Sequence, residues 1–257
     1  MKTILFISAL IPVTAMAATS WDGTWRTKLD SFQVSGKPES FELTKGEFHC
    51  ASCVPAVSIP ADGKDHAVTG HPYYDTVSVR IVDGSSIQWT TKSKGKLVSE
   101  NALSVSADHN SLTTVTVDHT GAQAATFKQV EKRVGSLAAG VHAISGEWQP
   151  TATTSASDSG TTVKIESTAN GIKTNYNGWI TDAKFDGKPV PVVGDPAHTM
   201  AAFKRLGANL LEETDTRDGK VTDMTHWELG ADGQSIQMTD QDQLHGTTVR
   251  FTMTRVP

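Results

Sequence analysis

The chain has 257 residues, of which 37% are hydrophobic and 20% are charged, and its formal net charge is −5. This length fits one large β domain or two domains of ordinary size. The acidic balance excludes a protein that binds nucleic acid through its phosphates, because such a protein needs a basic face. Gly and Pro, at 21 and 10 residues, are near average usage, which excludes collagen-like and wholly disordered chains and leaves a soluble globular protein.

The N-terminal segment 1–17 has the layout of a secretory signal peptide. Lys2 supplies the positive end, Ile4–Val13 the apolar stretch and Ala15–Ala17 the small-residue cleavage site. A membrane span needs about 20 apolar residues, and this stretch is half as long. We therefore expect cleavage after Ala17 and a periplasmic or secreted protein without a membrane span, in a compartment where disulfides persist.

The rest of the chain consists of two similar copies of one sequence unit. Gly23–Arg26 returns as Gly146–Gln149, and the offset between the two tryptophans is 148 − 25 = 123 residues. Further matches at an offset of 124 residues pair Asp62–Lys64 with Asp186–Lys188, Gly95–Leu97 with Gly219–Val221, and Phe127 with Phe251. Small residues in the segment between the copies are typical of a linker. The sequence thus predicts two domains related by internal duplication, at 18–134 and 146–257, with a linker at 135–145.

Within each copy the hydrophobic pattern has a period of two. Leu112–Val117 is rich in β-branched residues, and Val249–Thr254 alternates strictly between apolar and polar side chains. This alternation is typical of strands with one buried and one wet face, as in antiparallel sheets. Tight-turn dipeptides recur between them, at Asp62-Gly63, Asp83-Gly84, Asp186-Gly187, Asp218-Gly219 and Asp232-Gly233. The pattern predicts an up-and-down meander that closes into a barrel or packs as a sandwich.

One segment of the second copy has a conflicting pattern. Met200, Phe203 and Leu206 lie near helical spacing, with good helix formers between them. The repeat nevertheless aligns Met200–Arg205 with Thr76–Ile81, which alternates as a strand. Since the two copies should share a fold, we expect Ala201–Leu206 to be a strand.

The two Gly-x-Trp motifs, Gly23–Trp25 and Gly146–Trp148, resemble the motif that begins the first strand of lipocalin and wider calycin barrels. The chain is also similar to uncharacterised exported bacterial proteins in its Asp-Gly-Lys repeats and in segments 68–79 and 212–220. The resemblance implies an all-β fold of two tandem antiparallel up-and-down lipocalin-like barrels. It also implies that each Trp lies at the closed end of its barrel beside an arginine of the last strand. Arg133 and Arg255 end their respective copies and would take this structural role as cations over the indoles.

The same resemblance implies a barrel that holds one small apolar ligand. Eight strands leave an interior that is either filled by side chains or just large enough for a small molecule. The sequence leaves both states of the interior open.

Cys50 and Cys53 are the two cysteines of the chain, and three interpretations compete for them. An exported chain with an even cysteine count favours a disulfide. A thiol–disulfide oxidoreductase needs the first cysteine at a helix N-terminus, whereas Pro55 and Pro60 make a helix unfavourable here. A zinc site needs two further ligands, for which His49, His66 or His71 would have to converge. We expect a disulfide and no metal.

The loop around His71, Tyr73 and Tyr74 is the most distinctive in the chain. Exposed tyrosines beside a histidine favour a recognition surface. Alternatively, Gly70 and Pro72 shape a turn whose tyrosines cover the mouth of the barrel.

No nucleophile elbow and no phosphate-binding loop occurs in the sequence. The acidic segment Glu212–Asp215 is most simply a solvated strand edge that resists pairing with other chains. We therefore expect a non-enzymatic exported protein without a cofactor, which binds a small apolar ligand or a protein partner of the cell envelope. The alternatives are a structural or interaction module with filled barrels, and a redox or metal protein that uses Cys50 and Cys53.

Overall fold

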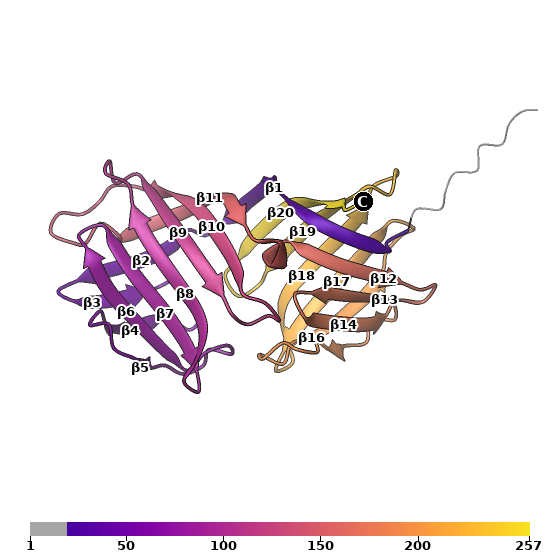
Figure 1. The fold of residues 1–257 in the computed structure, drawn as a ribbon, viewed down its shortest axis with the longest axis horizontal. Helices are drawn as coiled ribbons and strands as arrows, with labels where there is room; N and C mark the ends of the chain where they lie inside the picture. Colours follow the sequence, from indigo (N-terminus) through magenta and orange to yellow (C-terminus); the bar gives the residue numbers. More distant parts are fainter. Residues whose placement is uncertain (1–19) are drawn as a thin grey trace, which may run out of the picture.

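The computed structural model describes residues 20–257, and the predicted signal peptide at 1–17 lies outside the described residues. The described chain forms two nearly closed antiparallel barrels of ten strands each, arranged in tandem (Figure 1). The predicted fold class is thus confirmed. Among the described residues, the short 3₁₀ helix η1 (Asp158–Gly160) is the one helical segment, and no helix is long and apolar enough to cross a membrane.

The first barrel is a single sheet in the strand order β4-β3-β2-β11-β10-β9-β8-β7-β6-β5. Its strands are β2 (Glu39–Thr44), β3 (Glu47–Cys50), β4 (Val57–Pro60), β5 (His66–Ala67), β6 (Thr76–Asp83), β7 (Ser86–Ser93), β8 (Lys96–Val105), β9 (Ser111–Asp118), β10 (Ala125–Val134) and β11 (Gly146–Ala156). Neighbouring strands follow one another in the sequence everywhere except at β11, as expected of an up-and-down meander.

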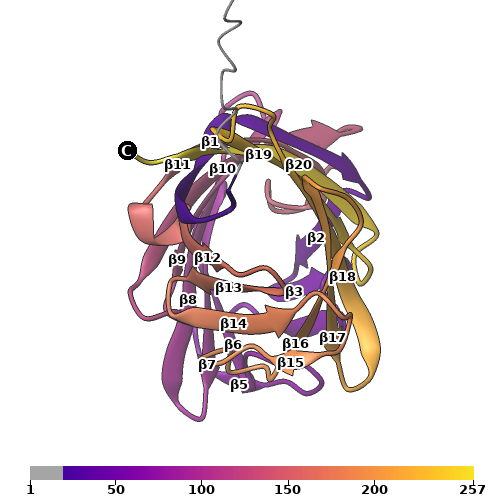
Figure 2. The same ribbon diagram turned by 90° about the vertical axis from the view of Figure 1, so that its right-hand side faces the viewer.

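The second barrel has the order β14-β13-β12-β1-β20-β19-β18-β17-β16-β15. Its strands are β1 (Gly23–Gly36), β12 (Thr162–Ser167), β13 (Gly171–Tyr176), β14 (Trp179–Lys184), β15 (Val190–Pro191), β16 (Met200–Arg205), β17 (Leu210–Arg217), β18 (Lys220–Leu229), β19 (Ser235–Asp242) and β20 (Thr247–Arg255). A bridge between Ile180 and Val193 joins β14 to the opposite edge of this sheet. Figure 2 views the molecule from the side of this barrel, with β12, β13 and β14 crossing in front.

The two sequence copies exchange their first strands. β1 opens the first copy but pairs with β12 and β20 of the second barrel, where its indigo ribbon lies beside the yellow β20 in Figure 1. β11 opens the second copy but pairs with β10 and β2 of the first barrel. The linker at 135–145 turns the chain back so that β11 becomes the antiparallel neighbour of β10. The first barrel is consequently continuous from 39 to 156 and is inserted between β1 and β12 of the second barrel.

The disputed segment is strand β16, as the repeat predicts. Ala201 and Phe203 are fully buried in the second barrel, whereas Lys204 and Arg205 are exposed. Pairing with β15 and β17 satisfies the backbone of β16, and this tertiary pairing outweighs the local helix propensity.

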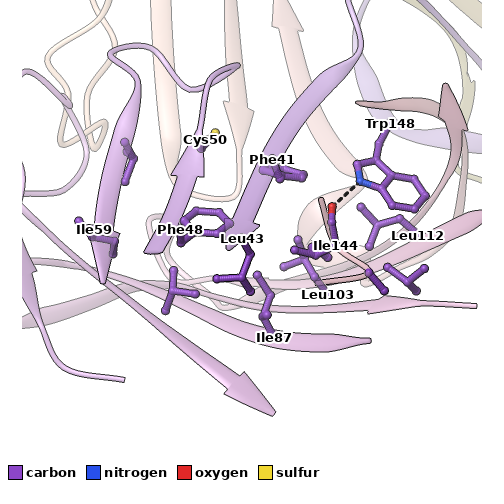
Figure 3. Close-up of a cluster of buried hydrophobic side chains, with 14 of the residues drawn as sticks. Phe41, Leu43, Phe48, Cys50, Ile59, Ile87, Leu103, Leu112, Ile144 and Trp148 are labelled. Carbon is purple, nitrogen blue, oxygen red and sulfur yellow. Dashed lines mark hydrogen bonds between the residues drawn. The ribbon is translucent and has the colours of Figure 1, made fainter. Parts of the chain in front are cut away.

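Each barrel has its own core of inward-facing apolar side chains. Phe41, Phe48 and Leu112 are among the buried residues of the first core, which Figure 3 shows in close-up. Ile165, Phe203 and Leu211 belong to the second core. The two cores are separate, so each barrel packs around apolar side chains of its own.

A tryptophan and an arginine close one end of the first barrel. The guanidinium carbon of Arg133 lies 4.0 Å from the centroid of the Trp148 ring. Trp148 Nε1 donates a hydrogen bond to the carbonyl of Ile144 at 2.9 Å (Figure 3). Arg133 also donates to the carbonyls of Ala143 and Ser145, each at 2.6 Å, so the cation is fully engaged by the backbone.

The second barrel repeats this closed end with Arg255 at 4.3 Å from the Trp25 ring. Each arginine was expected to lie beside the tryptophan of its own sequence copy. The strand exchange instead puts Trp25 under Arg255 and Trp148 under Arg133, so each indole meets the arginine of the other copy.

Candidate functional site

The open ends of the two barrels, opposite the Trp–Arg ends, face each other. The β9–β10 loop of the first barrel contacts the β13–β14 turn of the second. Ala122 N donates to the carbonyl of Asn177 at 2.7 Å, and Gln123 N donates to Asn177 Oδ1 at 3.1 Å. Trp179 Nε1 completes the contact with the carbonyl of Thr120 at 3.4 Å. These bonds hold the two mouths together.

The His71–Tyr74 loop lies at the same junction. The ring of Tyr73 stacks on Trp179 of the second barrel, with centroids 6.1 Å apart. Arg217 Nη2 donates to the Tyr73 hydroxyl at 3.3 Å. Tyr74 stacks on His71 at 4.5 Å and lines the interior of the first barrel. The two tyrosines thus serve different surfaces, one between the barrels and one within a barrel.

A cavity of about 870 Å³, here called the central cavity, lies between the open ends. Aromatic and aliphatic side chains from both barrels form much of its wall, namely Phe32, Val34, Phe41, Val54, Trp89, Leu244 and Val249. Lys37, Glu39, Glu147, Asp242 and His245 supply its charged groups. The cavity is therefore amphipathic, with apolar walls and a set of charged groups between them.

A second cavity of about 260 Å³, here called the inner pocket, lies inside the first barrel. It shares Glu39, Phe41, Trp89 and Gln129 with the central cavity, so the two adjoin. A barrel of eight strands was expected, whereas this sheet has ten. The additional strands widen the barrel, because barrel diameter grows with strand number. The first barrel is therefore partly hollow.

Hydrogen-bonding side chains cover one wall of the inner pocket. Thr91 Oγ1 lies 2.8 Å from Ser99 Oγ, and Thr116 Oγ1 donates to Asn101 Oδ1 at 2.8 Å. These groups satisfy one another in a ladder across β7, β8 and β9. They present a polar, uncharged surface to the pocket.

Glu131 is the most deeply buried carboxylic acid of this pocket, with 2% of its surface exposed. Thr114 Oγ1 donates to Glu131 Oε1 at 3.1 Å, while Oε2 has no hydrogen-bond partner. Burial, together with the charge of Glu39, raises the pKa of Glu131 to about 8. The Nε1 of Trp89 likewise has no hydrogen-bond partner. Buried polar groups left unpaired are rare and mark places where another molecule can supply the bond.

Asp242 and His245 form an ion pair that lines the central cavity. His245 Nδ1 lies 2.5 Å from Asp242 Oδ2, and this hydrogen bond raises the pKa of His245. Burial raises the pKa of Glu39, and the charge of His245 opposes that shift. Glu39 thus lines both cavities and interacts with the charge of His245.

The cysteines form the predicted disulfide, with an S–S distance of 2.10 Å. Cys50 ends β3, and the turn from Cys50 to Val54 lines the central cavity. No helix begins at this turn, so the residues lack the setting that activates a redox thiol. In residues 20–257, no group of three or more His, Cys, Asp or Glu side chains is arranged to hold a metal ion, and His49, His66 and His71 do not converge with the sulfurs.

The acidic segment Glu212–Asp215 is not a solvated edge, so that interpretation was wrong. It belongs to β17, which pairs on both sides, with β16 and β18. Trp227 Nε1 donates to Glu213 Oε2 at 3.0 Å inside the second barrel, and burial raises the pKa of Glu213 well above its usual range. Burial and the neighbouring carboxylates also raise the pKa of Asp215 to about 7 and that of Asp223 to about 6. The second barrel therefore has an acidic interior.

Glu39, Trp89 and Glu131 were not among the residues predicted from the sequence. The polar positions around Trp89 could have been predicted by comparing the two copies of the repeat. At an offset of 124, Thr91 and Ser99 align with Asp215 and Asp223. Polar residues at equivalent inward positions of both copies indicate barrel interiors that are not purely apolar. Glu39 and Glu131 have no comparable signal, because their proximity depends on β2 and β10 flanking the exchanged strand β11.

Comparison with protein-family models, curated proteins and solved structures finds no match to the chain. The resemblance to lipocalin-like proteins is therefore supported as far as two nearly closed antiparallel barrels, and membership of that family remains a prediction.

Proposed function

We propose that this protein is an exported, non-enzymatic binding protein that holds a small molecule between the mouths of its two barrels. The observation that carries the proposal is the central cavity of about 870 Å³, which adjoins the inner pocket of the first barrel. Small-molecule sites have volumes of about 300 to 1,000 Å³ and are lined mainly by apolar and aromatic side chains, with a few polar groups that fix orientation.

The walls suit a ligand with an apolar body. Phe32 and Val249 come from the second barrel and Phe41 and Trp89 from the first. Burying apolar surface against such walls contributes about 25 cal/mol per Å², which is the main favourable term for a small apolar molecule. Since both barrels supply the wall, ligand binding and the contact between the barrels are coupled.

The test is binding of the uncharged apolar dye N-phenyl-1-naphthylamine, followed by the rise of its own fluorescence. Thr153 lies on β11 and lines the central cavity. Thr153→Trp should fill part of the cavity and weaken dye binding at least tenfold. The control is Thr154→Trp, since Thr154 is the next residue of the strand, is exposed and is not part of the wall. Equal dye affinity in both variants, or no binding by the unaltered protein, would contradict the proposal.

A further inference from the structure

Two carboxylic acids face the inner pocket, and no basic side chain lines it. Glu39 comes from β2 and Glu131 from β10, and both line the 260 Å³ space. Among the described residues, none of those that line this pocket is a Lys, Arg or His. Acidic residues are almost never fully buried unless they are paired. His245 of the second barrel acts on Glu39 through its charge, but Glu131 has no basic partner in the pocket.

Glu131 has one carboxylate oxygen without a hydrogen-bond partner. Its Oε1 accepts the hydrogen bond from Thr114, whereas Oε2 is buried without a partner. An unsatisfied buried polar group carries a free-energy cost, and a charged group carries a larger cost. A group that supplies a donor and a positive charge at Oε2 would remove both costs.

The remaining walls suit a cation as well. The ring of Trp89 lies 6.2 Å from that of Phe41 in an edge-to-face arrangement, and Tyr74 completes an aromatic side of the pocket. The electron-rich faces of aromatic rings attract ammonium groups. The partnerless Nε1 of Trp89 adds a donor for an oxygen or nitrogen acceptor elsewhere on the ligand.

We propose that the inner pocket binds an organic ammonium ion, with Glu131 and Glu39 as its counter-ions and the aromatic rings of Trp89, Phe41 and Tyr74 around it. This inference rests on the proposed function, because the ligand's apolar body would extend into the central cavity. It adds the chemical class of the ligand: a small primary amine on an apolar body.

The first experiment compares three phenyl-substituted probes of similar size by isothermal titration calorimetry at pH 7. Phenethylamine carries an ammonium group, 2-phenylethanol a neutral hydroxyl and 3-phenylpropanoate a carboxylate. The amine should bind at least tenfold more tightly than either of the other two. Equal affinity of the amine and the alcohol would overturn the ammonium assignment, and tighter binding of the carboxylate would overturn it as well.

The second experiment substitutes the counter-ion. Glu131→Gln keeps the shape and the acceptor for Thr114 but removes the charge, so it should weaken phenethylamine binding at least tenfold. Glu39→Gln should weaken it in the same direction, which covers the case in which Glu131→Gln fails to fold. The control is Glu42→Gln, which neutralises an exposed carboxylate of the same strand as Glu39 that lines neither cavity, and it should leave the affinity within twofold.

Proton release supplies a readout that a merely structural role would not produce. At pH 7 the carboxyl of Glu131 is mostly protonated, since its pKa is about 8. Binding of the ammonium ion ionises this carboxyl, and its proton passes to the buffer. The calorimetric heat should therefore depend on the ionisation enthalpy of the buffer at pH 7, and not at pH 9 or in Glu131→Gln.

The two proposals fail in different ways. If the uncharged dye binds and responds to Thr153→Trp while the amine has no advantage over the alcohol, the ammonium assignment falls and the binding function stands. If neither the dye nor any of the three probes binds, the binding function itself falls.

Discussion

At the scale of single residues, the glycine of each Gly-x-Trp motif makes the Trp–Arg end of its barrel possible. Gly146 has φ +136°, and a Cβ at this position would collide with Nη1 of Arg133. The guanidinium therefore reaches the carbonyl of Ser145 only because the motif begins with glycine. The resemblance identified the Trp and the Arg, and the structure adds the physical reason for the glycine beside them.

Gly146→Ala should destabilise the protein by about 3 kcal/mol or more, because it combines backbone strain of roughly 1 to 3 kcal/mol with disturbance of a charged hydrogen bond. Urea unfolding followed by tryptophan fluorescence measures the change. The matched control is Gly135→Ala, since Gly135 has φ +78° with nothing within 4 Å of its Cβ position. Gly135→Ala should lower the free energy of unfolding only by the cost of a left-handed backbone conformation, about 1 to 2 kcal/mol. Equal losses in the two variants would show that the clash with Arg133 is unimportant.

At the scale of single elements, β17 makes the stability of the second barrel depend on pH. Burial, followed by the charges of Asp223 and Asp240, raises the pKa of Asp215 from 3.8 to about 7. The folded protein thus holds this proton more tightly than the unfolded chain does. The resulting stabilisation is complete below about pH 4 and is lost as the pH rises through 7.

Asp215→Asn should therefore raise the melting temperature at pH 8 and have little effect at pH 4. The expected gain in unfolding free energy at pH 8 is roughly 1 kcal/mol or more, since one pKa unit corresponds to about 1.4 kcal/mol. Calorimetric melting of both proteins between pH 4 and pH 8 measures it. Asp182→Asn on β14 is the control, because Asp182 is exposed. A difference between Asp215→Asn and the unaltered protein that does not grow with pH would contradict the acidic interior.

What the sequence could predict at this scale depended on the repeat. The strand β16 followed from alignment with Thr76–Ile81, against a local helix pattern. The prediction for Glu212–Asp215 was wrong because it treated the charges as one continuous exposed stretch. In β17, Leu211, Glu213 and Asp215 instead lie on one face of the strand. An acidic side chain facing inward contradicts the usual binary pattern. Departures of this kind are expected where a protein keeps polar groups for function or specificity.

At the scale of the whole molecule, the exchange of β1 and β11 could not be predicted from periodicity. Both first strands begin with a Gly-x-Trp motif and continue as a long extended segment, of 14 residues in β1 and 11 in β11, so both pairings satisfy the same local rules. The connections decide between them. The linker at 135–145 lets β11 fold back on β10, while Lys37 and Pro38 alone separate β1 from β2 and carry the chain from one barrel into the other. The exchange also lays β1 against β11, so that the two crossing strands join the barrels.

The exchange predicts which fragment folds on its own. A fragment of residues 37–156 contains all ten strands of the first barrel, including Trp148 beneath Arg133. It should melt cooperatively, as judged by circular dichroism, and retain a buried tryptophan.

The fragment 18–134, which follows the sequence repeat, lacks β11 and so leaves the facing edges of β10 and β2 unpaired. Unpaired edges expose backbone donors and acceptors and promote association, so this fragment should aggregate or melt without cooperativity. If 18–134 instead folds as stably as 37–156, then β1 can replace β11 within its own copy, and the exchange is one of two arrangements open to the chain.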